Sequence, residues 1–367
     1  MHILVAGGGE LRSKSTWSGT SYAIISALEK RNHIVDTYDV FEPINKHVAF
    51  VIKILGKFVY WRQYARSFAL NTICEKSLDK FLKGKKFDCI LFIAESVYVK
   101  RCDTPVYVYM DAVLGPLLEQ YPYKRDKKVP LFGFFYNKYC QNDKKALMRA
   151  NCVFSETDWV RNYLLGEYHI NPNKLQNIGC GVNLNPLSDV KSYDENLLLI
   201  VLRKGVEKLK GLYLLLEAFR IAKKTIPSVK LAIVGTDLGG EEGVSYYYNQ
   251  SRSVTVDLFK RCTLYTMPAL GEPNGVTYLE ALANKSPIVG LNRFAFPEFA
   301  GYGKYGFICK NEDPNDLASV IIDALSDKER LARMGEAGQR FVMERYSWDI
   351  VVDKMIAEIS RDCALAE

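Results

Sequence analysis

Short apolar runs alternate with longer amphipathic stretches along the whole chain, and this alternation constrains the fold more than any other feature. The apolar runs predict strands at 2–6, 33–39, 89–93, 106–110 and 152–155, and in the second half at 197–202, 230–234, 263–267 and 288–290. The amphipathic stretches predict helices at 20–31, 49–82, 133–149 and 157–166, then at 211–225, 276–284, 314–325 and 327–345. Strands that alternate with helices favour βαβ units and parallel sheets.

The length of 367 residues is sufficient for two α/β domains of ordinary size. The segment 183–196 (NLNPLSDVKSYDEN) is polar, contains a proline and lacks periodicity, so we expect the chain to pass between domains there. We therefore predict one Rossmann-like domain at 1–185 and a second at 195–347. Because open sheets of this kind bind ligands at the carboxyl ends of their strands, two such domains are expected to face each other across a cleft.

Composition excludes several classes of protein. No run of eighteen apolar residues is present, and MHILVAGGG lacks the basic and apolar regions of a secretory signal, so a cytoplasmic protein is expected. Nine scattered cysteines, with no CxxC pair and no histidine at ligand spacing, predict reduced thiols and no metal site. The net charge of +7 suits anionic substrates or an anionic membrane surface. No nucleic-acid partner is expected.

The most informative segment runs from Leu270 to Gly290, where a predicted strand enters a glycine-containing loop and then a helix. Glycines let the backbone approach a ligand closely, and a helix start offers unpaired N–H groups to an anion such as a diphosphate. Two carboxylates, Glu272 and Glu280, bracket the loop. Carboxylates accept hydrogen bonds from sugar and ribose hydroxyls, although each of them also fits a solvated charge or a helix-dipole partner.

At these residues the chain resembles the family 4 retaining glycosyltransferases, whose signature is Glu-x7-Glu followed by an alanine-rich helix and a Ser-Pro-Ile-Val type of step. Here the signature reads Glu272 to Glu280, Ala281–Ala283 and Ser286 to Val289. The resemblance extends from RKGVEKLKGLYLLLEAF and IPSVKLAIVGT to Tyr346-Ser347-Trp348, and so covers essentially the whole second half. It implies the GT-B fold, an α/β architecture of two Rossmann-like domains facing across a cleft. It also implies that a C-terminal helix, about 348–367, crosses back to complete the first domain.

The resemblance implies roles for individual residues. Glu280 would bind the donor ribose and Glu272 the donor sugar, and three residues would line the sugar-phosphate region: Asn274, Gly275 and Val276. An arginine and a lysine after the first strand of the second domain clamp the diphosphate in this family, which points to Arg203. Lys210 directly precedes a glycine, as the family lysine does, whereas Lys208 has the usual spacing from Arg203. We expect Lys210 to be catalytic and Lys208 to bind the donor; a solvated basic loop is the alternative.

The first half matches the family less closely. Trp17-Ser18-Gly19-Thr20 follows the first predicted strand and opens a helix, so the backbone N–H groups of Gly19 and Thr20 are expected near the donor phosphate. Where many family members carry a histidine after the strand 106–110, this chain has Asp111. That carboxylate is suited to accept a hydrogen bond from a hydroxyl or to act as a base, or else it caps the next turn. Glu156 occupies a position that resembles the family's cleft-lining Ser-Glu/Thr step.

Two further segments have two interpretations each. Residues 45–70 interleave apolar and aromatic residues with five cations, which fits an amphipathic helix on an anionic membrane presenting a lipid-linked acceptor. A core-packed helix whose cations reach the solvent explains the same pattern. Between 237 and 252, three consecutive tyrosines are suited to stack on a nucleobase or to lie at the surface.

These expectations combine into one reaction: metal-independent, retaining transfer of a sugar, hexosyltransferase-like, from a nucleoside diphosphate sugar to a hydroxyl of a saccharide or lipid-linked acceptor. The setting expected is bacterial-type polysaccharide or glycolipid assembly in the cytoplasm or at the inner membrane face, with no cofactor. A noncatalytic sugar-nucleotide-binding or partner subunit with the same fold is the alternative. A phosphorylase of this fold requires a longer chain with a cofactor lysine. A nicotinamide enzyme requires the GxGxxG fingerprint, which residues 7–9 do not provide.

Overall fold

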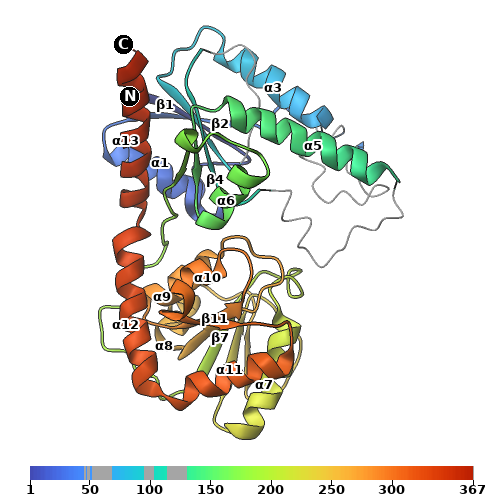
Figure 1. The fold of residues 1–367 in the computed structure, drawn as a ribbon, viewed down its shortest axis with the longest axis vertical. Helices are drawn as coiled ribbons and strands as arrows, with labels where there is room; N and C mark the ends of the chain where they lie inside the picture. The colour runs from blue at the N-terminus through green and yellow to red at the C-terminus, as the bar shows by residue number, and fades with distance from the viewer. Residues whose placement is uncertain (45–46, 48–49, 52–67, 95–102, 114–129, 367) are drawn as a thin grey trace. The chain divides into compact units, whose positions relative to one another are not determined.

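The computed structural model describes residues 1–44, 47, 50–51, 68–94, 103–113 and 130–366 of the chain (Figure 1). The described part divides into two compact units. Unit 1 contains the N-terminal strands and the C-terminal helix, and unit 2 contains Cys180–Ser347. Each unit is an α/β domain built on its own parallel sheet, as the alternation of apolar runs predicts.

The sheet of unit 1 has six parallel strands in the order β2-β1-β3-β4-β5-β6. Their bounds are β1 (His2–Gly7), β2 (Ile34–Asp39), β3 (Cys89–Ile93), β4 (Val106–Met110), β5 (Cys152–Ser155) and β6 (Leu175–Asn177). The helices are α1 (Thr20–Lys30), α3 (Phe68–Leu82), α5 (Pro130–Arg149), α6 (Asp158–Gly166) and α13 (Trp348–Ala366), with 3₁₀ turns η1 (Thr16–Gly19) and η3 (Pro172–Lys174).

Alternation along the strands divides unit 1 into two cores. In β1, Ile3 and Val5 join a cluster with the apolar residues of α1 and α13, whereas Leu4 joins the cluster formed with α3, α5 and α6. Successive side chains of a strand point to opposite faces, so an entirely apolar strand is buried on both. This burial explains why the strands of unit 1 read as continuous apolar runs.

Helix α13 returns the chain to unit 1, where it lies beside α1 (Figure 1). Its apolar residues Val351, Val352 and Met355 are buried in the core that α1 also fills. At the end of α1, Arg31 donates hydrogen bonds to Asp353 at 2.7 Å and to Asp349 at 2.9 Å. The docking of α13 therefore combines apolar burial with charge-assisted hydrogen bonds to the end of α1.

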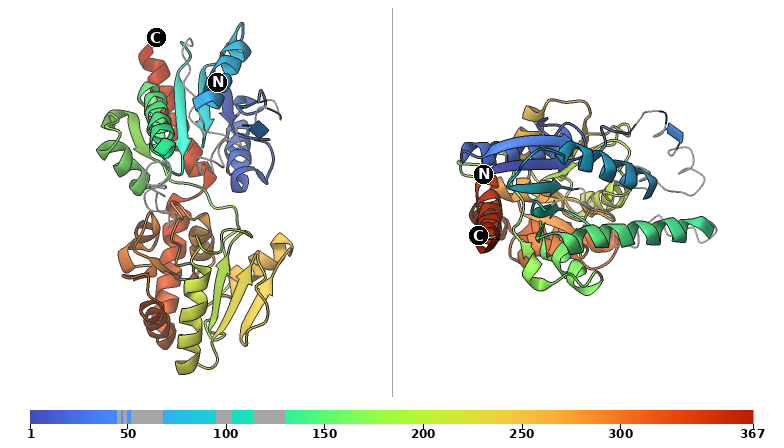
Figure 2. Two further views of the ribbon diagram at one scale, coloured as in Figure 1. Left: turned by 90° about the vertical axis from the view of Figure 1, so that its right-hand side faces the viewer. Right: turned by 90° about the horizontal axis from the view of Figure 1, so that it is seen from above.

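The sheet of unit 2 also has six parallel strands, in the order β12-β11-β10-β7-β8-β9. Figure 2 shows the ribbon of this unit from two further sides. The bounds of its strands are β7 (Leu197–Val201), β8 (Lys230–Val234), β9 (Val244–Tyr247), β10 (Leu264–Thr266), β11 (Ile288–Leu291) and β12 (Gly306–Cys309). The helices are α7 (Leu212–Thr225), α8 (Arg252–Arg261), α9 (Val276–Ala283), α10 (Phe296–Phe299), α11 (Pro314–Ser326) and α12 (Lys328–Arg345), with the 3₁₀ turn η4 (Gly301–Gly303). Helix α7 packs against α11, and α9 packs against α8 and α12.

Local sequence explains where several helices begin. The Thr157 side chain accepts a hydrogen bond from the backbone of Val160 at the start of α6. Asp313 caps α11 with Pro314 in its first turn, and Asp327 caps α12 by accepting from the N–H of Arg330. Such caps satisfy N–H groups that have no partner inside the helix, and each contributes roughly 1 kcal/mol.

The segment 183–196, expected as a connection between domains, is packed into unit 2. The Lys191 ammonium is buried and donates to three backbone carbonyl oxygens: those of Phe259 at 3.1 Å, Lys260 at 2.7 Å and Asn284 at 2.9 Å. These carbonyls end helices α8 and α9, so one lysine caps both. Ser188, Asp189, Ser192 and Asp194 of the segment are exposed, as its polar pattern indicates, whereas Lys191 is buried against the helix ends. Unit 2 begins before the segment, at Cys180.

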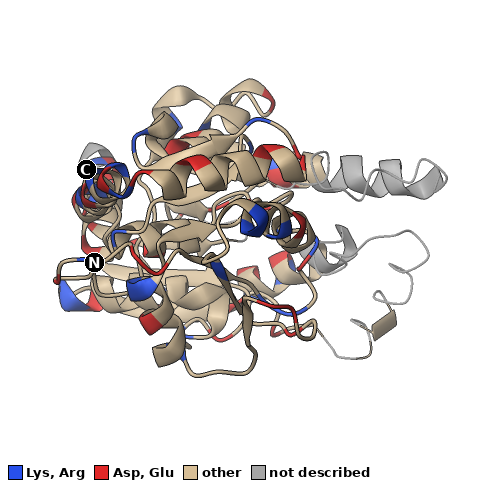
Figure 3. Cartoon of the chain, turned by 90° about the horizontal axis from the view of Figure 1, so that it is seen from below, with Lys and Arg blue, Asp and Glu red and all other residues tan. Residues whose placement is uncertain are grey.

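Three further findings concern the described residues as a whole. Seven cysteines of the described part are free thiols (74, 89, 140, 152, 180, 262 and 309), and all of these except Cys140 are buried. Within the described helices, none combines the length and hydrophobicity needed to cross a membrane. In the view of Figure 3, basic and acidic residues are interspersed along the helices and loops of the described part. The predicted helix 49–82 is described only as α3, and the amphipathic segment 45–70 lies largely outside the described residues.

Candidate functional site

In unit 2, the loops that follow β7 and β10 are joined at the carboxyl edge of the sheet. The backbone N–H groups of Leu270 and Gly271 both donate to the carbonyl oxygen of Leu209, at 2.8 and 3.1 Å. Gly211 has a φ of +73°, and a Cβ atom there would lie 1.9 Å from the carbonyl oxygen of Pro268. Only glycine permits this approach, which brings the basic loop 203–210 against the loop that carries Glu272.

Lys210 and Glu272 form an ion pair across these two loops. Their side chains are 19% and 17% exposed, so the pair is mostly removed from water. Burial, together with the positive charge of Arg203, lowers the pKa of the Lys210 ammonium to about 7, and the Glu272 carboxylate acts against that shift. The paired carboxylate favours the charged ammonium, which is the form that binds a further anion.

The two other cations of the predicted clamp lie differently. Arg203 and Lys208 are exposed, and the side chain of neither makes a hydrogen bond or ion pair among the residues that the structure describes. Glu207 organises the loop between them, because its carboxylate accepts from the N–H of Gly205 at 3.0 Å and from the Thr236 hydroxyl at 2.9 Å. Of the two candidate lysines, Lys210 is therefore the one that lies against Glu272.

The loop after β10 leads directly into α9. Gly275 has a φ of +81° and caps the helix, and a Cβ atom there would lie 2.6 Å from the Tyr278 ring and 3.2 Å from Cγ of Glu272. Asn274 is buried beside it, and Val276 is the first residue of the helix. The Tyr278 hydroxyl donates to the carbonyl oxygen of Met267 at 2.6 Å. This hydrogen bond fixes the start of α9 against the end of β10.

Glu280, one turn into α9, is paired with a residue that the sequence pattern does not indicate. Its Oε1 atom lies 3.2 Å from Nη2 of Arg252, the first residue of α8. Burial raises the pKa of the Glu280 carboxyl to about 7, while the charge and the hydrogen bond of Arg252 lower it. Arg252 and Glu280 lie 28 positions apart in the sequence, so no short-range sequence pattern indicates this pair.

The tyrosine-rich segment forms an edge of the same sheet. Tyr246 and Tyr247 belong to β9, which pairs in parallel with β8. Tyr248 follows the strand, and the Lys204 ammonium lies 5.3 Å from the centroid of its ring. The tyrosines are thus structural residues of an edge strand, except that Tyr248 is exposed at the carboxyl edge with a cation over its face.

In unit 1, the predicted residues of the α1 start lie in an unusual turn. Trp17, Ser18 and Gly19 all have positive φ, of 46°, 57° and 86°. The Trp17 ring packs edge-on against Tyr109 with the centroids 6.1 Å apart, which retains the turn against the sheet. Left-handed backbone at a tryptophan is strained, and such strain concentrates at functional sites. Gly19 caps α1, and Thr20, its first residue, is buried.

Asp111 and Glu156 follow neighbouring strands of unit 1. The N–H of Glu156 donates to the carbonyl oxygen of Met110 at 3.1 Å, which aligns the ends of β4 and β5. Glu156 is buried and Asp111 is partly buried. The structure therefore places both acids at the carboxyl edge of the sheet, where residues 7–9 and the α1 start also lie. Among the described residues, no group of three or more histidine, cysteine or acidic side chains could hold a metal ion.

The comparisons with known proteins agree with this architecture. Residues 188–341 match the family described as glycosyl transferases group 1, so the chain contains a domain of that family. A curated relative, the D-inositol 3-phosphate glycosyltransferase of Gordonia bronchialis, is 22% identical over 248 residues, which are 60% of this chain and 54% of the relative. The chain thus spans about half the length of the curated relatives that it matches.

Two solved structures share the fold along almost their whole length. Sucrose-phosphate synthase from Thermosynechococcus elongatus has a TM-score of 0.72 at 15% identity, and the match covers 100% of both chains. Anabaena HepE in complex with UDP has a TM-score of 0.67 at 14% identity, with 98% of this chain and 100% of that chain covered. The two parallel α/β domains therefore have the GT-B fold that the sequence predicts.

Proposed function

We propose that the chain transfers a sugar from a nucleoside diphosphate sugar to an acceptor hydroxyl, with retention of the anomeric configuration. The observation that carries this proposal is the pairing of Lys210 with Glu272 at the carboxyl edge of a sheet that belongs to a glycosyl transferases group 1 domain. Glu280 enters the same edge from α9. Cations for a diphosphate and acceptors for sugar and ribose hydroxyls thus belong to one unit.

In the proposed reaction, Lys210 and Arg203 hold the diphosphate and stabilise the negative charge that grows on it as the glycosidic bond breaks. An arriving diphosphate is the stronger anion, so it takes over the Lys210 ammonium and keeps it protonated. Glu272 is then released to accept a hydrogen bond from the donor sugar. Backbone N–H groups at the start of α9, beside Asn274 and Gly275, complete the anion site.

Retention follows in this proposal from attack on the same face that the leaving group departs from. The leaving phosphate oxygen takes the proton of the acceptor hydroxyl, so no carboxylate nucleophile and no metal ion enters a step. Lys208 is an outer donor contact. Gly19 directs its N–H group to the donor phosphate, and Thr20 beside it donates its own N–H to the carbonyl oxygen of Trp17. Asp111 orients the acceptor hydroxyl by accepting its hydrogen bond.

The acceptor class proposed is a saccharide or a lipid-linked sugar in polysaccharide or glycolipid assembly. Among the curated relatives, a GDP-mannose-dependent alpha-(1-6)-phosphatidylinositol monomannoside mannosyltransferase supports the glycolipid part of this class. Association with an anionic membrane surface remains a part of the proposal that concerns residues 45–70.

The first experiment is a thermal-shift screen of the purified chain with UDP-, GDP-, TDP- and ADP-sugars, followed by a hydrolysis assay. We expect one base to raise the melting temperature and its sugar nucleotide to be turned over. NMR of the product then gives the anomeric configuration. Inversion of that configuration would contradict the retaining mechanism, and the absence of binding to every donor would contradict the whole proposal.

A second candidate is a noncatalytic subunit that binds a sugar nucleotide. Asp111 supports this alternative, because it stands where many members of the resembled family carry a histidine. Tight binding of a donor without turnover, both with water and with a panel of sugar and polyol acceptors, would favour it over the transferase.

A further inference from the structure

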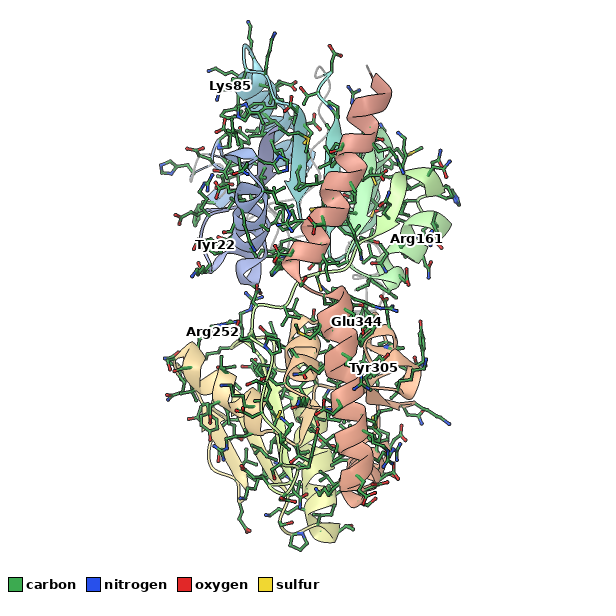
Figure 4. The ribbon with its side chains drawn as sticks, turned by 90° about the vertical axis from the view of Figure 1, so that its left-hand side faces the viewer. Tyr22, Lys85, Arg161, Arg252, Tyr305 and Glu344 are labelled. Atoms are coloured by element: carbon green, nitrogen blue, oxygen red, sulfur yellow. The ribbon has the colours of Figure 1, made fainter. Side chains whose placement is uncertain are left out.

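Arg252 and Glu280 form an ion pair between two helix starts at the carboxyl edge of unit 2, where Arg252 is labelled in Figure 4. The Nη2 atom of Arg252 donates to Oε1 of Glu280 at 3.2 Å and to the backbone carbonyl of Asn183 at 3.2 Å. The guanidinium is thus held at two points. One point belongs to α9, and the other lies at the beginning of unit 2.

The two partners differ strongly in burial. The Arg252 side chain is 63% exposed, whereas that of Glu280 is 11% exposed. Both contacts use Nη2, and the Nη1 and Nε donors make no hydrogen bond within the described part of the chain. On the carboxylate, only Oε1 has such a contact. One carboxylate oxygen and one edge of the guanidinium therefore stay available to a ligand.

The pair resolves an electrostatic conflict. A carboxylate buried against apolar residues prefers to be protonated, and a neutral acid accepts fewer hydrogen bonds than an anion. An adjacent guanidinium stays charged at every working pH and opposes that preference. Arg252 is the neighbour that lowers the pKa of Glu280 against the effect of burial.

The other elements packed on α9 also carry charged residues. They include Asp257, Lys260 and Arg261 on α8, Glu298 on α10, and Arg333, Glu336 and Arg340 on α12; Tyr265 on β10 and Tyr278 on α9 are titratable as well. Of all these groups, Arg252 is the one whose charge acts on the pKa of the Glu280 carboxyl. Tyr265 is buried and donates to the Thr277 hydroxyl at 2.8 Å. Glu336 is paired with Lys285 at 2.8 Å. Among described residues, Arg252 is thus the cation placed to control Glu280.

We propose that Arg252 is a positioning residue of the donor site: it holds the Glu280 carboxylate ionised and oriented, with one oxygen open to the ribose hydroxyls of the donor. This inference rests on the proposed function, because it names the residue that makes Glu280 a competent acceptor. Arg252 acts through Glu280 and takes no part in the bond changes of the transfer.

The test is the pH dependence of nucleotide affinity in three variants. Dissociation constants of UDP, GDP and ADP are measured by calorimetry from pH 5.5 to 9 for the wild type, and the nucleotide that binds best is used throughout. Arg252→Met removes the charge at similar volume, Arg252→Lys retains it, and Glu280→Gln removes the titrating group. The 2′-deoxy form of the same nucleotide is the matched ligand, since it lacks one hydroxyl that Glu280 accepts from.

We expect the nucleotide affinity of the wild type to fall as the pH is lowered. Arg252→Met should move the midpoint of this fall upward by about one pH unit, the lower end of the pKa shifts that loss of a neighbouring charge causes. At pH 7 that variant should bind about fivefold more weakly, and at pH 9 as the wild type does. Arg252→Lys should restore most of the profile. Glu280→Gln should bind the nucleotide weakly, and its affinity should not fall further as the pH is lowered. Arg252→Met should change the affinity for the 2′-deoxynucleotide less than the affinity for the nucleotide itself.

Other outcomes distinguish failure of the positioning role of Arg252 from failure of the proposed function. In one outcome, the wild type binds a nucleotide and Glu280→Gln weakens that binding, but Arg252→Met does not move the midpoint of the fall in affinity at low pH. The positioning role of Arg252 is then overturned and the proposed function stands. A loss in Arg252→Met that is equal at every pH overturns it as well, because that result assigns a direct contact or a merely structural role. If the wild type binds none of the three nucleotides, the proposed function itself fails.

Discussion

Lys210 and Glu272, from loops that follow two different strands, form an ion pair largely shielded from water. Removing one partner of such a pair strands the other charge. We therefore expect Lys210→Met to lower the free energy of unfolding by about 2 kcal/mol, less than the ~3–5 kcal/mol of a fully buried pair. Turnover should fall by about 100-fold through loss of leaving-group stabilisation. Urea denaturation and initial rates measure the two effects.

Lys208→Met is the matched control, because Lys208 lies in the same loop, is exposed, and its ammonium has no partner among the described residues. It should change stability by less than about 0.5 kcal/mol. The double variant Lys210→Met/Glu272→Gln should recover part of the lost stability, since no stranded charge remains. Equal destabilisation by the two lysine variants would contradict the pairing.

The stability of the chain should depend on pH through Glu280. The pKa of its carboxyl is raised from 4.5 to about 7 in the folded state, chiefly by burial. The folded state thus binds the proton more tightly, and the associated stability is present below about pH 4.5 and is lost as the pH rises through 7. The loss amounts to at most about 3 kcal/mol.

Melting temperatures of the wild type and of Glu280→Gln, taken without ligand between pH 5 and pH 8.5, measure this effect. The difference between them should shift in favour of the glutamine variant as the pH rises. Glu242→Gln is the control, because the Glu242 side chain is 92% exposed and should give a pH-independent difference. A constant difference for Glu280→Gln as well would show that the carboxyl titrates normally.

Alanine substitutions at Gly211 and Gly205, which lie in one loop, distinguish the effect of backbone strain from that of steric overlap. Both have positive φ, +73° and +90°, but a Cβ atom meets Pro268 only at Gly211 and meets nothing within 4 Å at Gly205. Gly205→Ala should cost about 1 kcal/mol of unfolding free energy from strain alone. Gly211→Ala should cost clearly more and should also abolish turnover, because it pushes apart the loops that hold Lys210 and Glu272. Similar costs would show that the loops separate easily.

Lys191 offers a test of the packed segment 183–196. Replacing it by methionine removes the ammonium that caps the carbonyls of α8 and α9. Unsatisfied buried carbonyls predict a loss of about 2–3 kcal/mol. Ser192→Ala, the exposed neighbour, should be nearly neutral. Hydrogen exchange should localise the change to the ends of α8 and α9; uniform exchange, or no loss of stability, would contradict the capping role.

Short-range pattern predicted most of the elements. Strands β3, β4, β5 and β8 have the predicted bounds, because each is an apolar run whose side chains are buried. The strands not predicted are β6, β9 and β12, and each lies at an edge of its sheet. An edge strand is paired on one side only and has a weaker apolar pattern, as the partly exposed β9 illustrates. Helix α8 was missed for a similar reason, since its first turns are polar and β-branched.

The sequence by itself determined the α/β class, the two-domain organisation and the positions of Glu272 and Glu280, because strand and helix periods and glycine turns are local properties of the chain. Tertiary structure alone decided which lysine meets Glu272, which cation meets Glu280, and that 183–196 packs on helix ends. Those relationships join residues far apart in the sequence, and their energies exist only after the sheet has brought separate loops to one edge. The Lys210–Glu272 pair depends on both. The sequence motif indicates each of the two residues, whereas their contact depends on the close approach of the two loops at Gly211.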